Sequence, residues 1–293
     1  MKQSTNKISV IIPTYKSVQT IIKTIDSLLK QTYPIWEIIV IDNASPDQTN
    51  KILTTKFGKR IKIFSLEKNI GVTGGRNFGI KQVSPESEMI LFIDHDMIAD
   101  KDMLKQLVQG FQLSSNIGIT TPKIFYKNPK NIIWSAGTGI NLWTGQVLFR
   151  GGLDHGQFDH STEVEVAPAV LLVKKTVIKR IKSFDPIYFA TYEDTDFCYK
   201  ARRNGFKTYY ISSAKAYHDL PYDQKDAQMR LLNRLYYIGR NRIIFLRRYG
   251  KFTALPLSMI FSLYYLFLCL KYKRLSEFWN YLKGTLDGMV IKV

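Results

Sequence analysis

The chain has 293 residues, of which 45% are hydrophobic, so it is long enough for one large globular domain or two closely packed ones. Its 42 lysine and arginine residues against 24 aspartate and glutamate residues give a net charge of +18, which indicates an anionic partner such as a nucleotide, an anionic lipid or a nucleic acid. Two cysteines, Cys198 and Cys269, exclude a disulfide framework and a zinc motif, which favours a reducing compartment. No signal-peptide apolar run precedes Pro13, so we expect a cytoplasmic location.

The first hundred residues alternate between strand and helix patterns. Short β-branched or apolar runs predict strands, and apolar residues that recur every three or four positions predict helices. The predicted strands are residues 8–13, 36–42, 61–66 and 89–94, and the predicted helices are residues 17–31, 45–57 (with Ser45 as N-cap) and 72–82. Continuous apolar strands between helices predict an α/β fold with a mostly parallel, Rossmann-like central sheet covered on both faces.

The pattern changes after about residue 115. Residues 117–126 and 166–175 predict two further strands, and the Gly-, Trp- and Thr-rich stretch 131–166 predicts hairpins or loops. Helices are expected near 176–181 and 194–204. No repeat or low-complexity linker appears, so we expect no domain boundary inside residues 1–220.

The C-terminal part differs from the rest in its charge. No acidic residue lies between Ala227 and Ser276, and the uncharged stretch 253–270 has basic residues on both sides. As a helix this stretch would be about 27 Å long at ~1.5 Å per residue, which is borderline for a ~30 Å hydrocarbon core. Basic flanks at both ends favour a segment that lies in the interface of an anionic leaflet. The alternative is a buried helix that closes the domain.

Two carboxylates stand one residue apart where the strand 89–94 ends. Ligands of open α/β sheets bind beyond the carboxyl ends of the strands, which is where Asp94 and Asp96 are expected. If the strand stays extended through His95, both side chains point the same way and repel each other unless a cation joins them. A divalent ion such as Mg²⁺ or Mn²⁺ takes such ligands and shares them with substrate phosphates. The alternative is a strand-end turn in which one carboxylate caps a helix.

Further polar residues are expected at the same edge of the sheet. The first strand ends in Pro13-Thr14-Tyr15, and Asp42 ends the second, where it could accept hydrogen bonds from a ribose or base or simply form a turn. Gly75 and Arg76 lie early in a predicted helix. The guanidinium there would contact a diphosphate, tie down the strand-end carboxylates, or remain solvated.

An acidic cluster, Glu193, Asp194 and Asp196, lies at a predicted helix start. Carboxylates are favoured at a helix N-terminus, which is the structural explanation for Glu193 or Asp196. A base that removes a proton from an alcohol would also be a partly buried carboxylate at the rim of a site.

Taken together, these segments resemble the family 2 glycosyltransferases of the GT-A fold. The resemblance covers roughly residues 7–220, in the family's order of motifs. It is carried by ISVIIPTYKSVQTIIKTIDSLLKQTYPIWEIIVIDNASPDQT, NIGVTGGRNFGI, FIDHDM, FDPIYFATYEDTDFCYKARRNGFKTYY and the later His218. The segments YYIGRNRIIFLRRYG and LKGTLDGM are similar to the rhamnosyltransferase-like branch.

The resemblance implies an inverting, metal-dependent transfer of a sugar from a UDP-, dTDP- or GDP-linked donor to a lipid-linked or surface-glycan acceptor. It implies a catalytic domain over residues 1–224, with a nucleotide-sugar-binding half (1–98) and an acceptor-binding half (99–224). Residues 225–293 would form a helical, membrane-associating tail. We therefore expect a peripheral or monotopic protein on the cytoplasmic face of the membrane, where cell-surface polysaccharide is made, with no nucleic-acid partner.

The same match assigns roles to individual residues. Asp194 is expected to be the catalytic base, because a sugar hydroxyl is a poor nucleophile until its proton is removed. Mn²⁺ or Mg²⁺ is expected to be held by Asp94, Asp96 and His218. The residues expected to bind the donor are Pro13, Thr14, Tyr15, Asp42, Gly75, Arg76 and Asp94. Glu193 and Asp196 are expected on the acceptor side.

Other classes fit the sequence less well. The turn after the first strand is PTYKSVQ, which lacks the glycines of a dinucleotide-binding oxidoreductase or a P-loop NTPase. A Gln-X-X-Arg-Trp motif of processive polymer synthases is absent, which favours a single-addition enzyme. The alternative function is a non-catalytic α/β protein that uses its basic tail to bind nucleic acid or a membrane.

Overall fold

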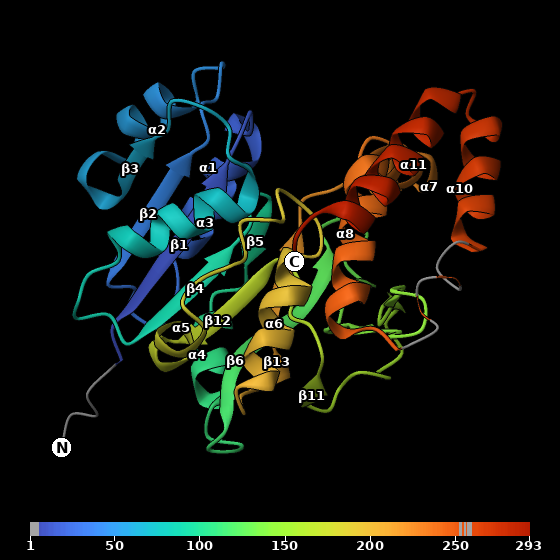
Figure 1. Cartoon of the computed structure of the whole chain (residues 1–293). Coiled ribbons are helices and arrows are strands. Elements are labelled where there is room, and N and C mark those ends of the chain that lie inside the picture. Colours follow the sequence, from blue (N-terminus) through green and yellow to red (C-terminus); the bar gives the residue numbers. More distant parts are fainter. Residues whose placement is uncertain (1–5, 252–253, 255, 257–259) are drawn as a thin grey trace. The chain divides into compact units, whose positions relative to one another are not determined.

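The computed structural model describes residues 6–251, 254, 256 and 260–293 (Figure 1). By its internal contacts the chain divides into two compact units. Unit 1 comprises Met1–Thr138, Arg150–Phe189 and Asp194–Leu220, and unit 2 comprises Gly139–Phe149, Ala190–Glu193 and Pro221–Val293.

Unit 1 is built on a sheet whose first half is parallel. The order β4–β1–β2–β3 makes this half, with β1 at Ile8–Thr14, β2 at Glu37–Asp42, β3 at Lys62–Ser65 and β4 at Met89–Ile93. Strand β12 (Val170–Lys174) pairs antiparallel with both β4 and β6 (Ile117–Tyr126). The other strands are β5 (Met97–Ala99), β7 (Ile132–Ser135), β10 (Gly152–Leu153), β11 (Thr162–Val164) and β13 (Lys207–His218).

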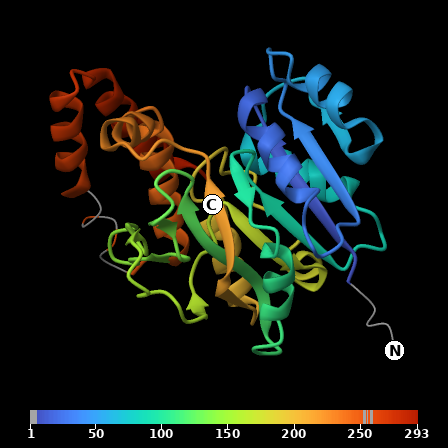
Figure 2. The same ribbon diagram turned by 180° about the vertical axis from the view of Figure 1, so that it is seen from behind.

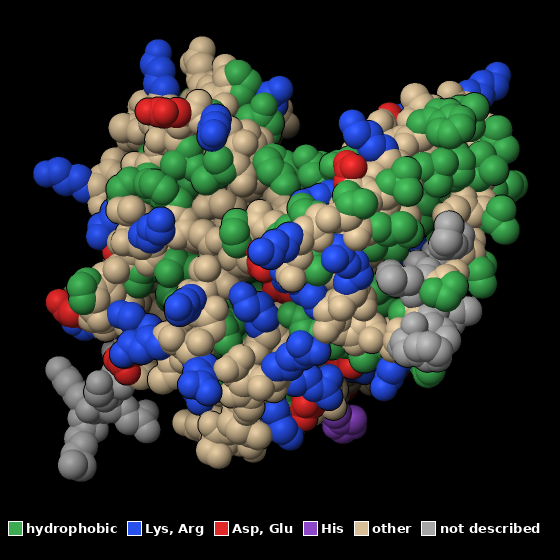
Figure 3. Space-filling model, viewed as in Figure 1, with side chains coloured by type: hydrophobic (Ala, Val, Ile, Leu, Met, Phe, Trp, Pro, Cys, Tyr) green, Lys and Arg blue, Asp and Glu red, His purple; other side chains and the backbone are tan. Residues whose placement is uncertain are grey.

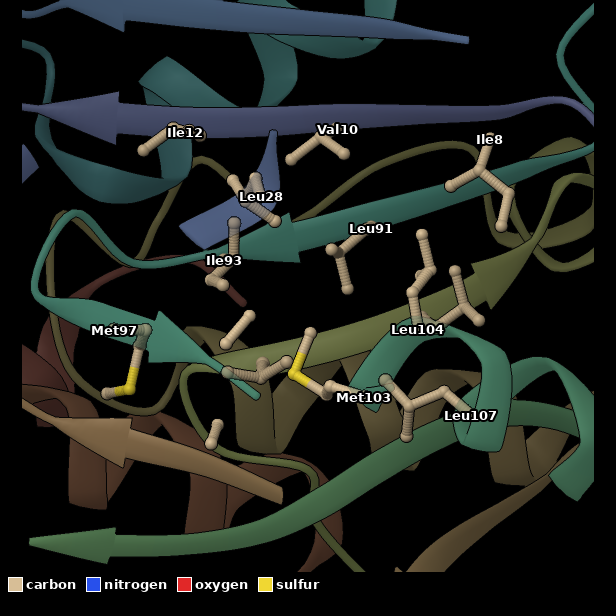
Figure 4. Packing of buried hydrophobic residues seen from close by; sticks show 14 of the residues in the cluster. Ile8, Val10, Ile12, Leu28, Leu91, Ile93, Met97, Met103, Leu104 and Leu107 are labelled. Carbon is tan, nitrogen blue, oxygen red and sulfur yellow. The ribbon is translucent and has the colours of Figure 1, made fainter. Parts of the chain in front are cut away.

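Helices cover both faces of the parallel half. Figures 1 and 2, which view the molecule from opposite sides, show α3 (Gly71–Gln82) and α1 (Val18–Leu28) on opposite faces. Alternate residues of β1 explain this, because Val10 and Ile12 share a core cluster with Leu28 of α1 (Figure 4). Ile11 faces the other way, toward α3. Gly79 admits this approach, since a Cβ there would lie 2.5 Å from the Ile11 side chain.

The predicted elements of unit 1 are confirmed with small shifts in their ends. The remaining helices are α2 (Thr49–Phe57), the 3₁₀ turn η1 (Gly58–Arg60), α4 (Met103–Gly110), α5 (Lys175–Ile181) and α6 (Glu193–Arg203), the last of which begins at the boundary between the units.

The predicted N-cap at Ser45 is wrong, because α2 begins at Thr49. The carboxylate of Asp47 accepts a hydrogen bond from the Thr49 N–H at 3.2 Å, which keeps the preceding residues in a turn. The Ser45 hydroxyl instead accepts from the Lys16 N–H at 3.0 Å. This bond ties the loop after β2 to the loop after β1.

Unit 2 consists mainly of helices. They are α7 (Gln224–Leu232), α8 (Leu235–Tyr249), α10 (Ile260–Lys271) and α11 (Leu275–Val290), with a short hairpin of β8 (Gly139–Ile140) and β9 (Val147–Leu148). Helices α8 and α11 pack closely through glycines: a Cβ at Gly284 would lie 2.1 Å from the Tyr236 carbonyl oxygen, and one at Gly288 would lie 2.5 Å from that of Arg240. The LKGTLDGM segment is therefore a helix-packing motif here.

The predicted uncharged segment 253–270 is only partly described. Its residues 253, 255 and 257–259 lie outside the described residues, and α10 accounts for its second half. Within the described ranges, none of the helices has both the length and the apolar character needed to cross a bilayer.

Candidate active site

A buried arginine joins two of the predicted site carboxylates in unit 1. The Arg76 side chain has no exposed surface, and its guanidinium pairs with Asp94 Oδ1 at 2.8 Å and with Asp194 Oδ1. The guanidinium also lies over the Phe184 ring, 5.1 Å from its centroid. Of the roles considered for Arg76, the structure shows the one in which it ties down the carboxylates.

The peptide units of Ala169 hold the same two acidic residues. Its N–H donates to Asp194 Oδ2 at 3.1 Å, and its carbonyl accepts from the Asp94 N–H at 3.1 Å. Ala169 adopts a φ of 61°, an unusual value for alanine that turns both polar groups toward the site. Nothing in the residue type indicates this role, so it could not be predicted from the sequence.

The same helix α3 also holds the segment that precedes Asp194. The Asn77 amide makes two bonds with the Phe184 backbone, donating to its carbonyl at 2.9 Å and accepting from its N–H at 3.0 Å. The Val72 N–H donates to the Phe189 carbonyl at 3.1 Å. Gly71 has a φ of 75°, and a Cβ there would lie 2.2 Å from the Phe189 carbonyl oxygen, so only glycine fits. The NIGVTGGRNFGI motif thus organises residues far along the chain.

Asp96 belongs to a second polar cluster. Its Oδ2 lies 3.1 Å from His218 Nε2, and its backbone carbonyl accepts from the Asp219 N–H at 2.8 Å. The His218 ring packs edge-on against Trp134 with centroids 4.5 Å apart. Two of the three predicted metal ligands, Asp96 and His218, therefore lie in direct contact.

The two aspartates of the predicted metal site have different hydrogen-bond partners. The condition for a shared direction, a strand that stays extended through His95, is not met: β4 ends at Ile93, and the Met97 N–H donates to the Asp94 carbonyl at 3.2 Å to close a turn. The Thr24 hydroxyl fixes this turn by donating to the His95 carbonyl at 2.7 Å. Asp94 consequently pairs with Arg76, and Asp96 pairs with His218.

Burial and neighbouring charges shift the two carboxyl groups in opposite directions. Burial raises the pKa of Asp94, and the nearby Asp194 and Asp96 charges add to this, so the Arg76 charge offsets the rise only partly. Burial also raises the pKa of Asp96, but the hydrogen bond and charge of His218 outweigh it, and the net pKa is lowered.

The residues expected near a nucleoside lie together at the ends of β1 and β2. The Asn43 N–H donates to the Thr14 carbonyl at 2.9 Å, and Asp42 Oδ1 accepts from the Ser45 N–H at 3.1 Å. Tyr15 is exposed, and the buried Asn43 Oδ1 has no hydrogen-bond partner among the described residues. A Cβ at Gly75 would lie 2.9 Å from Asn43 Nδ2 and 3.1 Å from Pro13 Cβ, so Gly75 brings α3 close to this edge.

The two residues expected on the acceptor side differ in exposure. Glu193 is partly exposed at the first position of α6. Asp196 is completely buried, with the Tyr188 hydroxyl 3.5 Å from its Oδ1. Asp196 therefore faces the protein interior in this structure, and an acceptor has no direct access to it.

Similarity to known proteins agrees with this arrangement. The family model described as glycosyl transferase family 2 matches residues 9–157, and the one described as glycosyl transferase family group 2 matches residues 89–282. The chain belongs to glycosyltransferase family 2. This membership favours an enzyme over the alternative of a non-catalytic binding protein.

Two relatives match about a third of this glycosyltransferase. It is 41% identical over 103 residues to poly(ribitol-phosphate) β-N-acetylglucosaminyltransferase TarS of Staphylococcus aureus, a match that covers 34% of this chain and 18% of TarS. It is 36% identical over 110 residues to UDP-Glc:α-D-GlcNAc-diphosphoundecaprenol β-1,3-glucosyltransferase WfgD of Escherichia coli, which covers 38% of this chain and 42% of WfgD. The chain thus spans less than half the length of each.

A solved structure shares the fold over nearly the whole glycosyltransferase. Mannosyltransferase PcManGT from Pyrobaculum calidifontis, determined in complex with GDP-Man and Mn²⁺, superposes with a TM-score of 0.59 at 15% identity. The match covers 99% of this chain and 77% of PcManGT. The predicted GT-A fold is confirmed.

The ion pairs of Arg76 generate a prediction about stability. Arg76→Met should lower the free energy of unfolding by about 3 kcal/mol, because it leaves two carboxylates close together in a largely buried setting without their shared cation. The loss should be smaller at pH 5 than at pH 8, because burial and the neighbouring carboxylates raise the pKa of Asp94, and its protonation at the lower pH relieves the repulsion that Arg76 no longer offsets. Urea denaturation at the two pH values measures both effects.

Arg202→Met is the matched control. Arg202 pairs with Glu165 at 3.2 Å, but its side chain is 54% exposed, so its loss should cost less than about 1 kcal/mol at either pH. If both variants lose the same free energy of unfolding, the Arg76 ion pairs contribute no more to stability than an exposed ion pair.

Proposed function

We propose that this glycosyltransferase moves a sugar, with inversion, from a UDP-, dTDP- or GDP-linked donor to a lipid-linked or surface-glycan acceptor, with the help of a divalent metal ion. The observation that carries the proposal is the meeting of Asp94, Asp194 and the Asp96–His218 pair around the carboxyl end of β4. In the proposal residues 1–224 form the catalytic domain, with donor and acceptor halves at 1–98 and 99–224. The YYIGRNRIIFLRRYG segment supports membership of the rhamnosyltransferase-like branch.

The residues present fit part of a metal site. Among the described residues, no three or more His, Cys, Asp or Glu side chains gather as a complete metal cage. Asp96 and His218 offer one carboxylate and one imidazole that already lie within 3.1 Å of each other. Such a pair suits Mn²⁺ or Mg²⁺ when substrate phosphates supply further oxygens, and PcManGT was solved with Mn²⁺. When bound, the ion would neutralise charge that develops on the leaving diphosphate.

Asp194 is proposed as the base. Arg76 and the Ala169 N–H each occupy one of its oxygens, which fixes the orientation of the carboxylate. A carboxylate has about four acceptor sites, so one lone pair on each oxygen remains for the acceptor hydroxyl proton. Thr14, Tyr15 and Asp42 are proposed to contact the nucleoside, and Glu193 is proposed to face the acceptor.

The C-terminal helices of unit 2 are proposed to rest on an anionic membrane at its cytoplasmic face. Exposed apolar side chains follow one face of α10 at helical spacing, namely Ile260, Leu263, Tyr264, Phe267 and Leu270. The opposite face of α10 is buried against Tyr281 of α11, so this helix is apolar all round. Figure 3 shows the resulting hydrophobic surface over α10 and α11. Basic residues at Lys271, Lys273, Arg274, Lys283 and Lys292 suit anionic lipid.

The metal proposal predicts that Asp96→Ala abolishes transfer and removes the Mn²⁺-dependent part of nucleotide affinity. The change deletes one of two protein ligands while leaving Arg76 and Asp194 in place. UDP and GDP affinities are measured by calorimetry with Mn²⁺ and with EDTA. Asp26→Ala, at an exposed pair with Lys56, is the control. Full activity in EDTA or in Asp96→Ala would contradict the proposal.

The base proposal predicts that Asp194→Asn lowers kcat by about 10²-fold or more, the usual contribution of a positioned base, with little change in donor affinity. Turnover is measured with UDP-glucose, UDP-N-acetylglucosamine, UDP-N-acetylgalactosamine, GDP-mannose and dTDP-rhamnose, and folding is checked by thermal unfolding. A variant that keeps its kcat at saturation but binds donor weakly would make Asp194 a donor ligand instead.

The membrane proposal predicts that a Leu263→Glu/Phe267→Glu variant loses at least tenfold in affinity for vesicles containing phosphatidylglycerol. These side chains are 70% and 63% exposed, so the charges should not disturb the fold. Leu113→Glu, at a 59% exposed leucine of unit 1, is the matched control. Flotation is measured at low and high salt, with neutral vesicles alongside. Unchanged flotation of the double variant would reject the proposal. The proposal would also be rejected if the wild-type protein does not bind vesicles and the double variant only changes from a dimer to a monomer.

A further inference from the structure

The chain enters the acidic cluster through an unusual backbone conformation. Thr191 and Tyr192, directly before Glu193-Asp194, have φ values of 64° and 63°. A β-branched residue such as threonine rarely adopts a positive φ, because its side chain then crowds the following carbonyl. Two such residues in succession persist only where the surroundings hold them.

Asn241 of α8 supplies that hold within unit 2. Its side chain is completely buried, and its amide nitrogen donates to the Ala190 carbonyl at 2.7 Å and to the Thr191 carbonyl at 3.0 Å. The Thr191 hydroxyl lies 3.3 Å from the same nitrogen. The other end of the amide accepts from Arg240 Nη1 at 2.9 Å, so the orientation of the group is fixed.

A second contact from the same helix face restrains Tyr192. Phe245, one helical turn after Asn241, packs against the Tyr192 ring with centroids 5.7 Å apart. The Tyr192 hydroxyl donates to the Gly145 carbonyl at 2.5 Å. Contacts with Asn241, Phe245 and Gly145 of unit 2 thus hold residues 190–192. Asp194 follows two residues after this segment.

We propose that Asn241 is a positioning residue for Asp194. By holding residues 190–192 in their left-handed turn, it sets the direction in which the chain enters α6 and hence the place of the carboxylate. An asparagine suits this task because one nitrogen carries two N–H groups, enough for two neighbouring carbonyls. An aspartate of the same shape would turn a negative oxygen toward them. This inference rests on the proposed role of Asp194 as the base.

The test separates positioning from packing. Asn241→Ala should lower kcat by about tenfold to a hundredfold, the effect of a displacement on the order of 1 Å, and change the donor KM by less than about threefold. Replacing Thr191 by glycine removes the steric cost of its positive φ, so the turn should form without its clamp. Thr191→Gly should therefore raise the kcat of the Asn241→Ala variant. This rise should be at least threefold greater than the effect of Thr191→Gly on the kcat of the wild-type protein.

Thr285→Ala is the matched control. Thr285 is a buried polar residue of unit 2 whose hydroxyl donates to the Tyr281 carbonyl, so its loss should lower thermal stability without changing kcat. If Asn241→Ala does not fold, Asn241→Ser takes its place, because a hydroxyl can donate only one of the two bonds. All assays use the full chain and the nucleotide sugar with the fastest turnover among the five named above.

Three results would overturn the inference. They are an unchanged kcat in Asn241→Ala, a kcat loss that Thr191→Gly does not restore, and a loss that appears only in the donor KM. Asp194→Asn, assayed in parallel, keeps the two proposals apart. If that variant remains fully active, the base assignment fails, whatever Asn241 does. If it is inactive and Asn241→Ala behaves like Thr285→Ala, only the positioning role fails.

Discussion

The burial of the Arg76 guanidinium is the constraint on which the site depends. A charge without exposed surface is tolerated only when opposite charges and hydrogen bonds replace water. Here Asp94 and Asp194 supply the opposite charges, from positions 18 and 118 residues further along the chain than Arg76. A few further contacts of unit 1 hold the segments that carry these two acidic residues. Gly71 and Asn77 hold the segment before Asp194, and the Ala169 peptide groups hold both acidic residues.

Separate partners give the neighbouring aspartates different electrostatic environments. Asp94 shares a cation with Asp194, and its pKa is raised by burial and by that second carboxylate. Asp96, two residues later, has its own partner in His218, which lowers its pKa against the effect of burial. The turn closed at Met97 is what allows this division, since an extended strand would have placed both side chains on one side.

The helices of unit 2 pack on one another and also hold part of the chain before α6. Close glycine contacts fix α8 against α11, and α8 in turn holds residues 190–192 through Asn241 and Phe245. Helix α10 has one face buried on α11 and one exposed apolar face. The contacts of α8 therefore support the proposed positioning role. The exposed face of α10 supports the proposed membrane contact, and the two proposals depend on different residues.

The sequence by itself determined the order of strands and helices in residues 8–94 and the identity of the acidic residues, because hydrophobic periodicity is local and the motifs carry their own residue types. The family resemblance also placed Asp96 and His218 in one predicted metal site, and the structure brings these two side chains within 3.1 Å of each other. Only the tertiary structure decided that Arg76 is a buried clamp, that Asp196 faces inward, and that Ala169 and Asn241 act through their polar groups. Those roles depend on contacts between segments distant in sequence and on φ values, and neither leaves a periodic pattern in the chain.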